Sequence, residues 1–535
     1  MQQPSVSPST SSRAWNRLAS IRGPLLFLIV FAAIALYYSY PQYYHYLPCS
    51  VHSWRQTDGT AIALTYYLQN TGLFEPQFLN QMQGDPHTVG EFPLLYYVAA
   101  QLFKYFGWQD GLFRLLNLLL FASGCYALYW VGKQWIKDEL LVLCIPVLLF
   151  SSPVMAYYSF NFLPDPPALG LALLAWPAYL RFQQKAQYRW LYLSMLLLLL
   201  AGLIKVTALL SYGILIGISG LQWLRLLPSS SPRLLHLPRL LVAFLLVPLG
   251  FAAWYFWAKH YNASHQSTYF LASIQPIWSM SPEHIERTLR RIWKGWLDDY
   301  FFPPTHLLLL GCTLFTGWHR RHLPSGVAAV IGLSLMGTLG IFLLWFNQFL
   351  HHDYYIITLM LSAVALLMGS AIVLVRRFPG LVRHWAFRSL LLIFVLLNLH
   401  HAKKELHYRY ADDSKYMKSY KSIYAEQEAL QQFLLDRGVE PEALVISTPD
   451  ESPNTTLYYL RRSGWTQFNN VKKWTKVQQG KHFDWPAIQD LRQQGARYLI
   501  LHDPAYLQRE ELQPALQKPL GDFKGQLFVF DLEGL

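Results

Sequence analysis

Charged residues are scarce in this chain of 535 residues. Asp, Glu, Lys and Arg make up only 14% of it, whereas hydrophobic residues make up 53%. An average soluble domain carries about 25% charged residues, so this chain lacks the polar surface of a large soluble enzyme. Its apolar residues are gathered into long runs, and many of these approach the roughly 20 residues that cross the hydrocarbon core of a membrane. The composition therefore indicates a membrane protein with several spans.

Cysteine is also rare. Of the four cysteines, Cys125, Cys144 and Cys312 lie inside apolar runs and Cys49 lies in a predicted loop. This pattern offers neither a disulfide framework nor a Cys-x-x-Cys metal site. Residues 1–23 are rich in Ser, and the apolar run after them lacks a small-residue cleavage site, so we expect a cytoplasmic tail and an uncleaved anchor.

Acidic residues are too few to balance the basic ones. The 44 Lys and Arg exceed the 31 Asp and Glu, which gives a formal charge of +13. Such an excess is typical of a nucleic-acid surface or of cytoplasmic loops in a membrane protein. If the first run crosses outward, eleven apolar runs alternate across the membrane, and the inner loops hold most of the Lys and Arg. The charge therefore predicts a cytoplasmic N-terminus and no nucleic-acid partner. The predicted spans are 24–40, 111–131, 139–158, 167–182, 189–204, 206–224, 239–257, 304–318, 325–346, 354–375 and 389–400.

This topology leaves two long segments on the outer side of the membrane. The first is an outer loop, 41–110, with amphipathic helices predicted near 57–70 and 92–106. The second is the C-terminal segment 401–535, where the composition becomes that of a soluble protein and a helix-like stretch is twice followed by an apolar strand-like one. We therefore predict a polytopic α-helical membrane domain, 24–400, followed by a small extracytoplasmic α/β domain.

Ionisable residues near or within membrane spans are costly, so they are functional candidates by default. Those of this chain fall on the outer side of the predicted topology, which predicts a single outward-facing cavity. In such a cavity a carboxylate can act as a base while cations hold an anion, as glycosyl transfer from a lipid-linked sugar phosphate requires. The candidates are His52, Arg55, Asp58, Glu91, Asp165, Lys205, Asp298, Asp299, His351, His352 and Asp353.

Each candidate also has a structural alternative. Asp58 is placed to cap the helix that follows it, and Glu91 to favour the N-terminus of the next helix. Asp165 stands where a span begins, and Lys205 is long enough to reach the interface from within the bilayer.

The remaining candidates have alternatives of the same kind. Asp298 and Asp299 fit a solvated loop. His351 and His352 are poor joint ligands for zinc, because adjacent residues on a helix point about 100° apart. Tyrosines such as Tyr354 are also suited to anchor a span at the interface. All of these candidates lie on the outer side of the predicted topology, and this shared location favours a functional site.

Five short motifs follow one another along the chain. Together they resemble the bacterial members of the dolichyl-phosphate-mannose-protein mannosyltransferase-like group, which are membrane glycosyltransferases of the GT-C fold, similar in plan to the lipid A aminoarabinose transferase. The resemblance covers about residues 1–400. It implies an inverting transferase that moves a sugar from a polyprenyl-phosphate donor to a lipid, glycan or protein hydroxyl, on the periplasmic side of the inner membrane. The motifs are Trp54 to Asp58, Glu91 to Pro93, Pro164 to Pro166, Gly202 to Lys205 and His352 to Tyr355.

The resemblance also implies roles for single residues. Asp58 matches the catalytic base of the family, and Asp165 matches a second acid that assists near the acceptor. Lys205, His352 and Tyr354 match positions that line the cavity, where contact with the donor phosphate is expected.

One departure from the family bears on phosphate binding. Phe92 stands where the aminoarabinose branch has a phosphate-binding Lys, so Lys205, Arg55 or a His would supply that charge. We also assign Glu91 and Asp353 to substrate binding. Transferases with monosaccharide-phosphate donors generally use no metal, and we therefore expect neither an obligate metal nor another cofactor.

A transporter or flippase of lipid-linked or small solutes is the alternative function. Such carriers usually show internal repeats and broken helices near the bilayer midplane. This sequence shows no repeat, and its polar candidates gather at one surface, which favours the transferase. A glycan polymerase or ligase would depend on Arg-rich outer loops, whereas those here are rich in acids and aromatics. No motif encodes the sugar, the acceptor or the role of the C-terminal domain.

Overall fold

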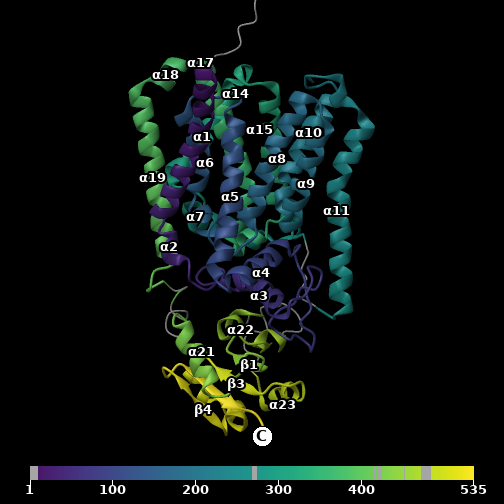
Figure 1. Ribbon diagram of the computed structural model, residues 1–535, viewed down its shortest axis with the longest axis vertical. Coiled ribbons are helices and arrows are strands. Elements are labelled where there is room, and N and C mark those ends of the chain that lie inside the picture. The colour runs from purple at the N-terminus through teal and green to yellow at the C-terminus, as the bar shows by residue number, and fades with distance from the viewer. Residues whose placement is uncertain (1–9, 268–273, 415–416, 418–423, 451, 471–482) are drawn as a thin grey trace, which may run out of the picture.

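The structure is a computed structural model that describes residues 10–267, 274–414, 417, 424–450, 452–470 and 483–535. Long helices form a bundle, and a small α/β domain lies beyond one end of it (Figure 1). Two shorter helices, α3 (Ser53–Gln69) and α4 (Leu94–Phe106), lie between the bundle and that domain. These two helices correspond to the amphipathic helices predicted in the outer loop. Of the predicted tail 1–23, residues 1–9 lie outside the described residues, and helix α1 begins at Thr10.

Every predicted span coincides with one helix or with two consecutive ones, which confirms a polytopic α-helical fold. Six of the described helices are long and apolar enough to cross a membrane, and three shorter ones are apolar. Eleven spans therefore remain a prediction. The helices are α1 (Thr10–Tyr37), α5 (Asp110–Gly132), α6 (Glu139–Phe150) with α7 (Pro153–Tyr158), α8 (Asp165–Lys185), α9 (Tyr188–Ile204), η1 (Val206–Leu209) with α10 (Leu210–Trp223), α11 (Leu237–Ser264), α14 (Pro303–Trp318), α15 (Ser325–Leu344), η6 (Asp353–Met360) with α17 (Leu361–Arg377) and α19 (Trp385–Arg409).

Large apolar side chains cover the outside of the bundle. Leu28 on α1 is 63% exposed, Leu310 on α14 58% and Met336 on α15 73%. Contact with lipid satisfies such side chains, because hydrocarbon tails are as apolar as they are. Further short helices connect or follow the spans: α2 (Tyr40–Tyr43), η2 (Pro232–Leu235), η3 (Ile277–Ser279), α12 (Pro282–Arg291), η4 (Ile292–Trp296), α13 (Leu297–Tyr300), η5 (Arg320–His322), α16 (Gln348–His351) and α18 (Pro379–Arg383).

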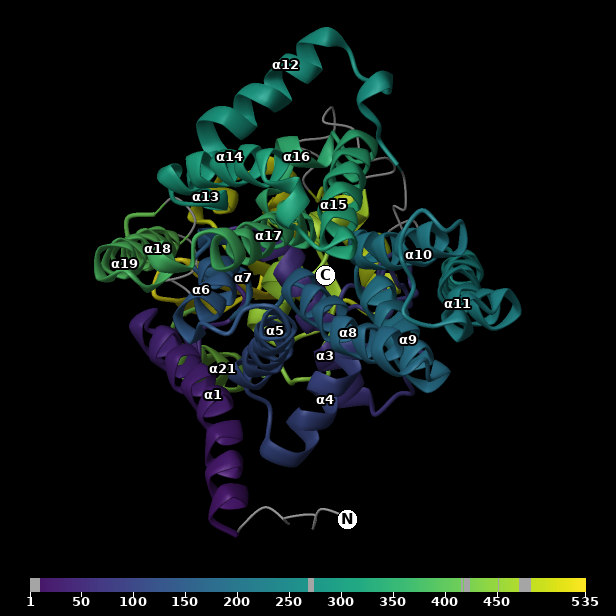
Figure 2. The same ribbon diagram turned by 90° about the horizontal axis from the view of Figure 1, so that it is seen from above.

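Helices α5 and α8 cross at two glycines near the middle of the bundle (Figure 2). A Cβ atom at Gly170 would lie 2.3 Å from the carbonyl oxygen of Leu120, and one at Gly124 would lie 2.5 Å from the Cα of Gly170. Any larger residue would therefore push the two helices apart. This close contact fixes the start of α8, where Asp165 stands.

The C-terminal domain contains one five-stranded sheet in the order β2-β1-β3-β5-β4. Strand β1 is parallel to β2 and β3, and β5 is antiparallel to β3 and β4. Both predicted helix-then-strand units are present, as α21 (Gln427–Leu435) before β1 (Val445–Thr448) and α23 (Trp485–Gln493) before β3 (Tyr498–Leu501). The other elements are α22 (Thr455–Leu460), β2 (Gly464–Trp465), η7 (Gln467–Asn470), η9 (Pro504–Gln508), η10 (Glu510–Leu516), β4 (Pro519–Phe523) and β5 (Leu527–Asp531).

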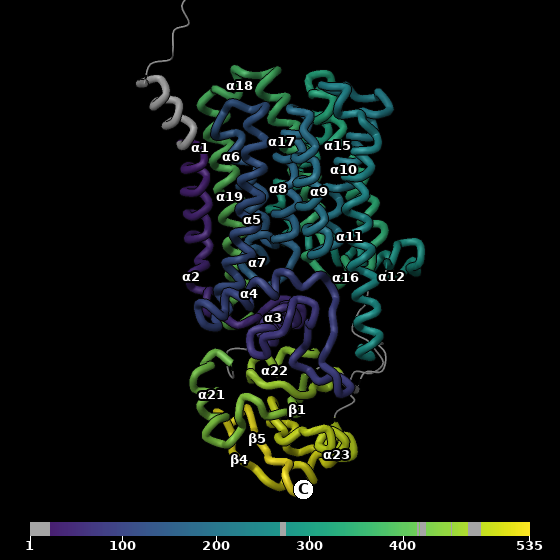
Figure 3. The backbone as a smooth tube through the Cα atoms, turned by 45° about the vertical axis from the view of Figure 1, so that its right-hand side comes forward, coloured from purple at the N-terminus to yellow at the C-terminus, as the bar shows by residue number. Residues whose placement is uncertain are grey.

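The outer loop binds this domain through main-chain hydrogen bonds. The N–H of Gly464 in β2 donates to the carbonyl of Leu79 at 3.1 Å, and the N–H of Gln81 donates to the carbonyl of Gly464 at 2.7 Å. Only glycine fits at position 464, because a Cβ there would lie 1.8 Å from the carbonyl oxygen of Val445. Residues 79–81 thus extend the edge of the sheet, and α22 packs beneath α3 (Figure 3).

Candidate active site

Glu91 and Arg55 form an ion pair where the outer loop meets α4. Nη2 of Arg55 donates to Oε1 of Glu91, and the hydroxyl of Tyr96 on α4 donates to the same oxygen. Gly59 on α3 makes room for this arrangement, because a Cβ there would lie 2.5 Å from the Tyr96 ring. Burial raises the pKa of Glu91, but Arg55, Tyr96 and the more distant Lys205 together hold that pKa below its usual value.

Glu91 stands just before the helix that follows it and does not cap it. Helix α4 begins at Leu94 after Pro93, and its N-terminus has no side-chain cap. The carboxylate of Glu91 instead contacts the side chains of α3 and α4.

Asp165 and Lys205 form a second pair, deeper in the bundle. Oδ1 of Asp165 lies 3.0 Å from Nζ of Lys205, and the side chains are 1% and 13% exposed. Lys205 has extended backbone dihedrals and lies between α9 and η1. Its side chain therefore projects from a break between two helices. The rings of Tyr354 and Tyr355 lie 5.1 and 4.4 Å from Nζ, within the range of a cation–π interaction. The alternative that Lys205 reaches out to the interface is therefore wrong.

Asp165 begins α8, as its structural alternative predicts, but it does not cap that helix. Its second carboxylate oxygen, Oδ2, is buried and accepts no hydrogen bond from any residue that the structure describes. An unsatisfied buried acceptor is costly, so this oxygen is available to a donor group of a substrate.

Asp353 is the centre of a third cluster and is fully buried. Its Oδ2 accepts from Nη2 of Arg409 at 2.8 Å, and its Oδ1 accepts from the hydroxyl of Tyr158 at 2.7 Å and lies 3.2 Å from Nε2 of His52. Arg409 also donates to Asp299 at 2.8 Å. Asp299, a candidate whose structural alternative was a solvated loop, thus lies in α13 and forms an ion pair.

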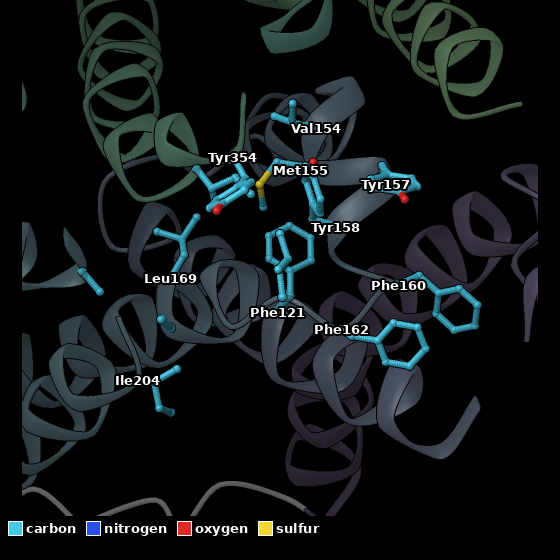
Figure 4. Close-up of a cluster of buried hydrophobic side chains, with 14 of the residues drawn as sticks. Phe121, Val154, Met155, Tyr157, Tyr158, Phe160, Phe162, Leu169, Ile204 and Tyr354 are labelled. Atoms are coloured by element: carbon cyan, nitrogen blue, oxygen red, sulfur yellow. The ribbon is translucent and has the colours of Figure 1, made fainter. Parts of the chain in front are cut away.

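Aromatic rings connect the second cluster to the third. The His52 ring lies 5.2 Å from Tyr354 and 5.3 Å from His352. Figure 4 shows Tyr354 and Tyr158 among apolar side chains, which include Phe121, Met155 and Leu169. Tyr158 and Tyr354 therefore belong to the hydrophobic core and also contact the polar groups Asp353 and Lys205. Nδ1 of His352 is buried, and among the described residues it has no hydrogen-bond partner.

Asp58, also on α3, lies against the C-terminal domain. The capping alternative is wrong, because α3 begins at Ser53 after His52 and Asp58 stands inside it, only 1% exposed. Its Oδ1 accepts from Nδ2 of Asn454 at 3.2 Å. The Asn454 oxygen in turn accepts from the N–H of Leu79 at 3.2 Å. Arg55 is three residues before Asp58, so the two side chains are neighbours on the helix surface.

The structure therefore brings the predicted residues together at one end of the bundle. Arg55 pairs with Glu91, Lys205 pairs with Asp165 beneath Tyr354, and Tyr354 and His352 adjoin the Asp353 cluster. Asp58 joins through its place on α3. A cation that is paired with an ionised carboxylate can exchange that carboxylate for an incoming phosphate. This exchange is the chemistry expected of a transferase.

Four contributors to this site were not predicted from the sequence. They are Tyr96, Tyr158, Arg409 and Asn454. Arg409 lies within the segment assigned to the soluble domain, because α19 continues nine residues beyond position 400. It is preceded in the sequence by Lys403, Lys404 and His407. These neighbours give no local signal for a buried ion pair.

Comparisons with known families and with curated proteins give no match. Among solved structures, the chain is similar to ArnT from Cupriavidus metallidurans in the apo state, with a TM-score of 0.60 and 14% identity over 95% of this chain and 98% of that one. The same ArnT bound to undecaprenyl phosphate gives a TM-score of 0.61 and 13% identity over 94% and 97%. The apo oligosaccharyltransferase from Archaeoglobus fulgidus gives 0.50 and 12% over 89% and 69%. These neighbours have the GT-C fold, and this chain shares it.

Proposed function

We propose that this protein is a GT-C glycosyltransferase that takes a sugar from a polyprenyl-phosphate donor and transfers it to a hydroxyl of a lipid, glycan or protein. The shared fold with ArnT, which has been solved with undecaprenyl phosphate, supports this class of donor. The observation that carries the proposal is the pairing of Arg55 with Glu91 and of Lys205 with Asp165 at one end of an apolar bundle.

The two cations would bind the phosphate of the donor. When the phosphate enters, Nζ of Lys205 and the guanidinium of Arg55 exchange part of their carboxylate contacts for phosphate oxygens. In the transfer, the bond between the anomeric carbon and the phosphate oxygen breaks, and both electrons stay on the phosphate. The cations stabilise this developing charge, an effect that grows in a site from which water is excluded. The polyprenyl tail would remain among the exposed apolar side chains of the bundle.

Asp58 would act as the general base. The acceptor hydroxyl attacks the anomeric carbon from the face opposite the phosphate, which inverts that carbon, and its proton passes to the Asp58 carboxylate. Asn454 donates to Oδ1 of Asp58 and would hold that carboxylate in position. Asp165 would orient the acceptor through Oδ2, the oxygen that no described residue satisfies.

The remaining predicted residues would shape the binding site. Glu91 and Asp353 hold Arg55 and Arg409 in place between turnovers, while His352 and Tyr354 line the site beside Lys205. Base and cations supply everything that a glycosyl transfer needs, so the proposal includes neither a metal nor another cofactor in the reaction.

The basic loops support an orientation in the membrane. Helix α18 (Pro379–Arg383), with Arg376 and Arg377 before it, lies at the end of the bundle away from α3 and α4 (Figure 1). By the positive-inside rule that end would face the cytoplasm. The site and the C-terminal domain would then face the periplasm of an inner membrane.

Replacement of Asp58 by Asn tests the proposal. Loss of a general base lowers rates by about 10²–10⁴-fold, so transfer from a panel of polyprenyl-phosphate sugars should fall by that factor in Asp58→Asn. The matched control is Asp490→Asn, an exposed carboxylate of the C-terminal domain, which should keep full activity. Both variants should elute from size exclusion like the wild type.

Mass spectrometry of membrane lipids and surface glycans, with and without the gene, tests the reaction class. Loss of one sugar from one species would identify donor and acceptor together. A fully active Asp58→Asn would remove the assignment of the base. Unchanged glycans with altered solute uptake would show a carrier instead.

A further inference from the structure

A second polar cluster lies apart from the candidate active site. Asp85 and His87 of the outer loop meet His265, which follows the last turn of α11. Oδ1 of Asp85 lies 2.5 Å from Nδ1 of His87, and Oδ2 lies 2.7 Å from Nδ1 of His265. The two imidazole rings are stacked with their centroids 4.4 Å apart. Among the residues that the structure describes, this is the one group of at least three His, Cys, Asp or Glu placed to hold a metal ion.

We propose that Asp85, His87 and His265 bind a divalent transition metal, with zinc as the best match. Two imidazole nitrogens and one carboxylate oxygen form a donor set that zinc commonly takes, with water in the fourth position. Their ligand atoms already lie within 4.8 Å of one another. The side chains are 40%, 30% and 28% exposed, so an ion can enter from solvent without a rearrangement of the fold.

The main chain holds the two loop ligands independently of any contact between them and His265. The N–H of Phe78 donates to the carbonyl of Pro86 at 2.9 Å, and the N–H of Thr88 donates to the carbonyl of Pro76 at 3.2 Å. These bonds pair two arms of the loop in antiparallel register, with Gln77 opposite His87. Asp85 and His87 therefore sit on a hydrogen-bonded arm of defined conformation.

Helix α11 is fastened to the same arm three residues before His265. The amide of Asn262 donates to the carbonyl of Val89 at 2.8 Å and accepts from the N–H of Val89 at 2.9 Å. The side chain of Asn262 is 4% exposed. This buried double hydrogen bond places the third ligand opposite the other two, so the ligands are positioned by contacts that do not involve the ligands themselves.

The surroundings of the imidazoles also suit metal binding. The side-chain amide of Gln77 lies 2.9 Å from Nε2 of His87, which directs Nδ1 of that ring toward Asp85. A histidine that binds a metal through one ring nitrogen usually donates the N–H of its other nitrogen to a neighbouring acceptor. The side-chain amide of Gln77 accepts this hydrogen bond through its oxygen when the amide is rotated by about 180°. The ring of Tyr261 packs on His265 with centroids 4.6 Å apart.

The bound ion would fasten the outer loop to α11 and would take no part in the transfer reaction. Val89 lies two residues before Glu91, and the N–H of Phe92 donates to the carbonyl of Leu203 at 3.0 Å, close to Lys205. The metal site would thus stabilise the loop segment that leads to Glu91 of the first cation pair. The same segment contacts the chain two residues before Lys205 of the second pair. Its existence is independent of the function proposed above.

Elemental analysis of the full chain, purified in detergent through a tag without histidines, tests the proposal. After loading with zinc and removal of excess metal, the wild type should retain zinc in a stoichiometric amount. Asp85→Asn and His265→Ala should lose it. His260→Ala, which removes an exposed histidine one turn earlier on α11, should retain it. Gln77→Ala should weaken zinc affinity by about 10–100-fold, because it removes the group that orients His87.

Cobalt provides a second readout that does not depend on activity or on the variants. Co²⁺ added to the wild type should give the visible absorption of a four-coordinate ion with nitrogen and oxygen ligands, and zinc should displace it. A wild type that holds no zinc and gives no such spectrum overturns the proposal. Zinc content unchanged in both Asp85→Asn and His265→Ala overturns it equally.

Discussion

The amide of Asn454 donates a hydrogen bond to the carboxylate of Asp58 at 3.2 Å, across 396 residues of chain. Asn454 belongs to the C-terminal domain, and Asp58 is the base proposed for the reaction. Both side chains are buried. The domain thus contributes a group that holds the carboxylate of the proposed base.

Replacement of Asn454 by Ala should lower the turnover rate and leave the KM for the donor unchanged. A hydrogen bond to a charged group contributes about 1.5–3 kcal/mol, which corresponds to about 10–100-fold in kcat. Steady-state kinetics against Gln489→Ala, an exposed amide of the same domain, provide the comparison. Equal kcat in Asn454→Ala and wild type would show that this contact does not position Asp58.

Gly59→Ala should reduce activity without removing any functional group. The new methyl would meet the Tyr96 ring at 2.5 Å and displace it from Glu91, and such overpacking costs about 1–3 kcal/mol. Gly72→Ala is the matched control in the same outer loop, because its methyl meets only a Glu75 oxygen at 3.6 Å. Transfer assays and thermal unfolding of both variants measure the effect. Similar behaviour of the two would mean that the position of Tyr96 is unimportant.

Lys205→Met should destabilise the protein more than Lys205→Met combined with Asp165→Leu. The single change leaves a buried carboxylate without its cation, which costs about 3–5 kcal/mol, whereas an apolar pair of similar volume is often neutral. Neither variant should transfer sugar, because the phosphate would lose its cation. Unfolding midpoints in detergent measure the first effect and transfer assays the second. An active double variant would contradict the role of Lys205.

The C-terminal domain should lose stability as the pH falls below neutral. His502 lies between the hydroxyls of Ser447 and Tyr424, each 2.6 Å from a ring nitrogen, and burial lowers the pKa of His502 from 6.5 to about 3. Between these values the unfolded chain binds a proton that the folded domain does not. Stability is therefore complete above pH 6.5 and declines by about 1.4 kcal/mol per pH unit toward pH 3.

Proteolysis of the full chain at several pH values, with the C-terminal fragments identified by mass spectrometry, measures this decline. His502→Gln should make the susceptibility of β1 and β3 nearly independent of pH in this range. An equally steep dependence in that variant would assign the pH effect to other groups.

The helical bundle could be predicted from hydrophobic runs alone, and so could the end of the bundle at which the site lies. The pairing of Lys205 with Asp165 could not, because it depends on where α9 breaks and on how closely α5 and α8 approach. Residue spacing carries no information about either.

The capping alternative for Asp58 is wrong for a local reason. His52 adopts a left-handed conformation directly before α3, which begins six residues earlier than a cap at Asp58 would place it. Arg409 and Asn454 were missed for another reason. Their partners lie 56 and 396 residues away, and no local pattern encodes such contacts.

The strand-like pairing of residues 79–81 with Gly464 has a consequence for exchanging parts between proteins that share this fold. The C-terminal domain is not a separate module, since one edge of its sheet is completed by a segment that enters the chain more than 300 residues earlier. A chimera that grafts only the tail would leave those main-chain groups without partners. The smallest transferable unit is the domain together with the outer-loop segment that it binds.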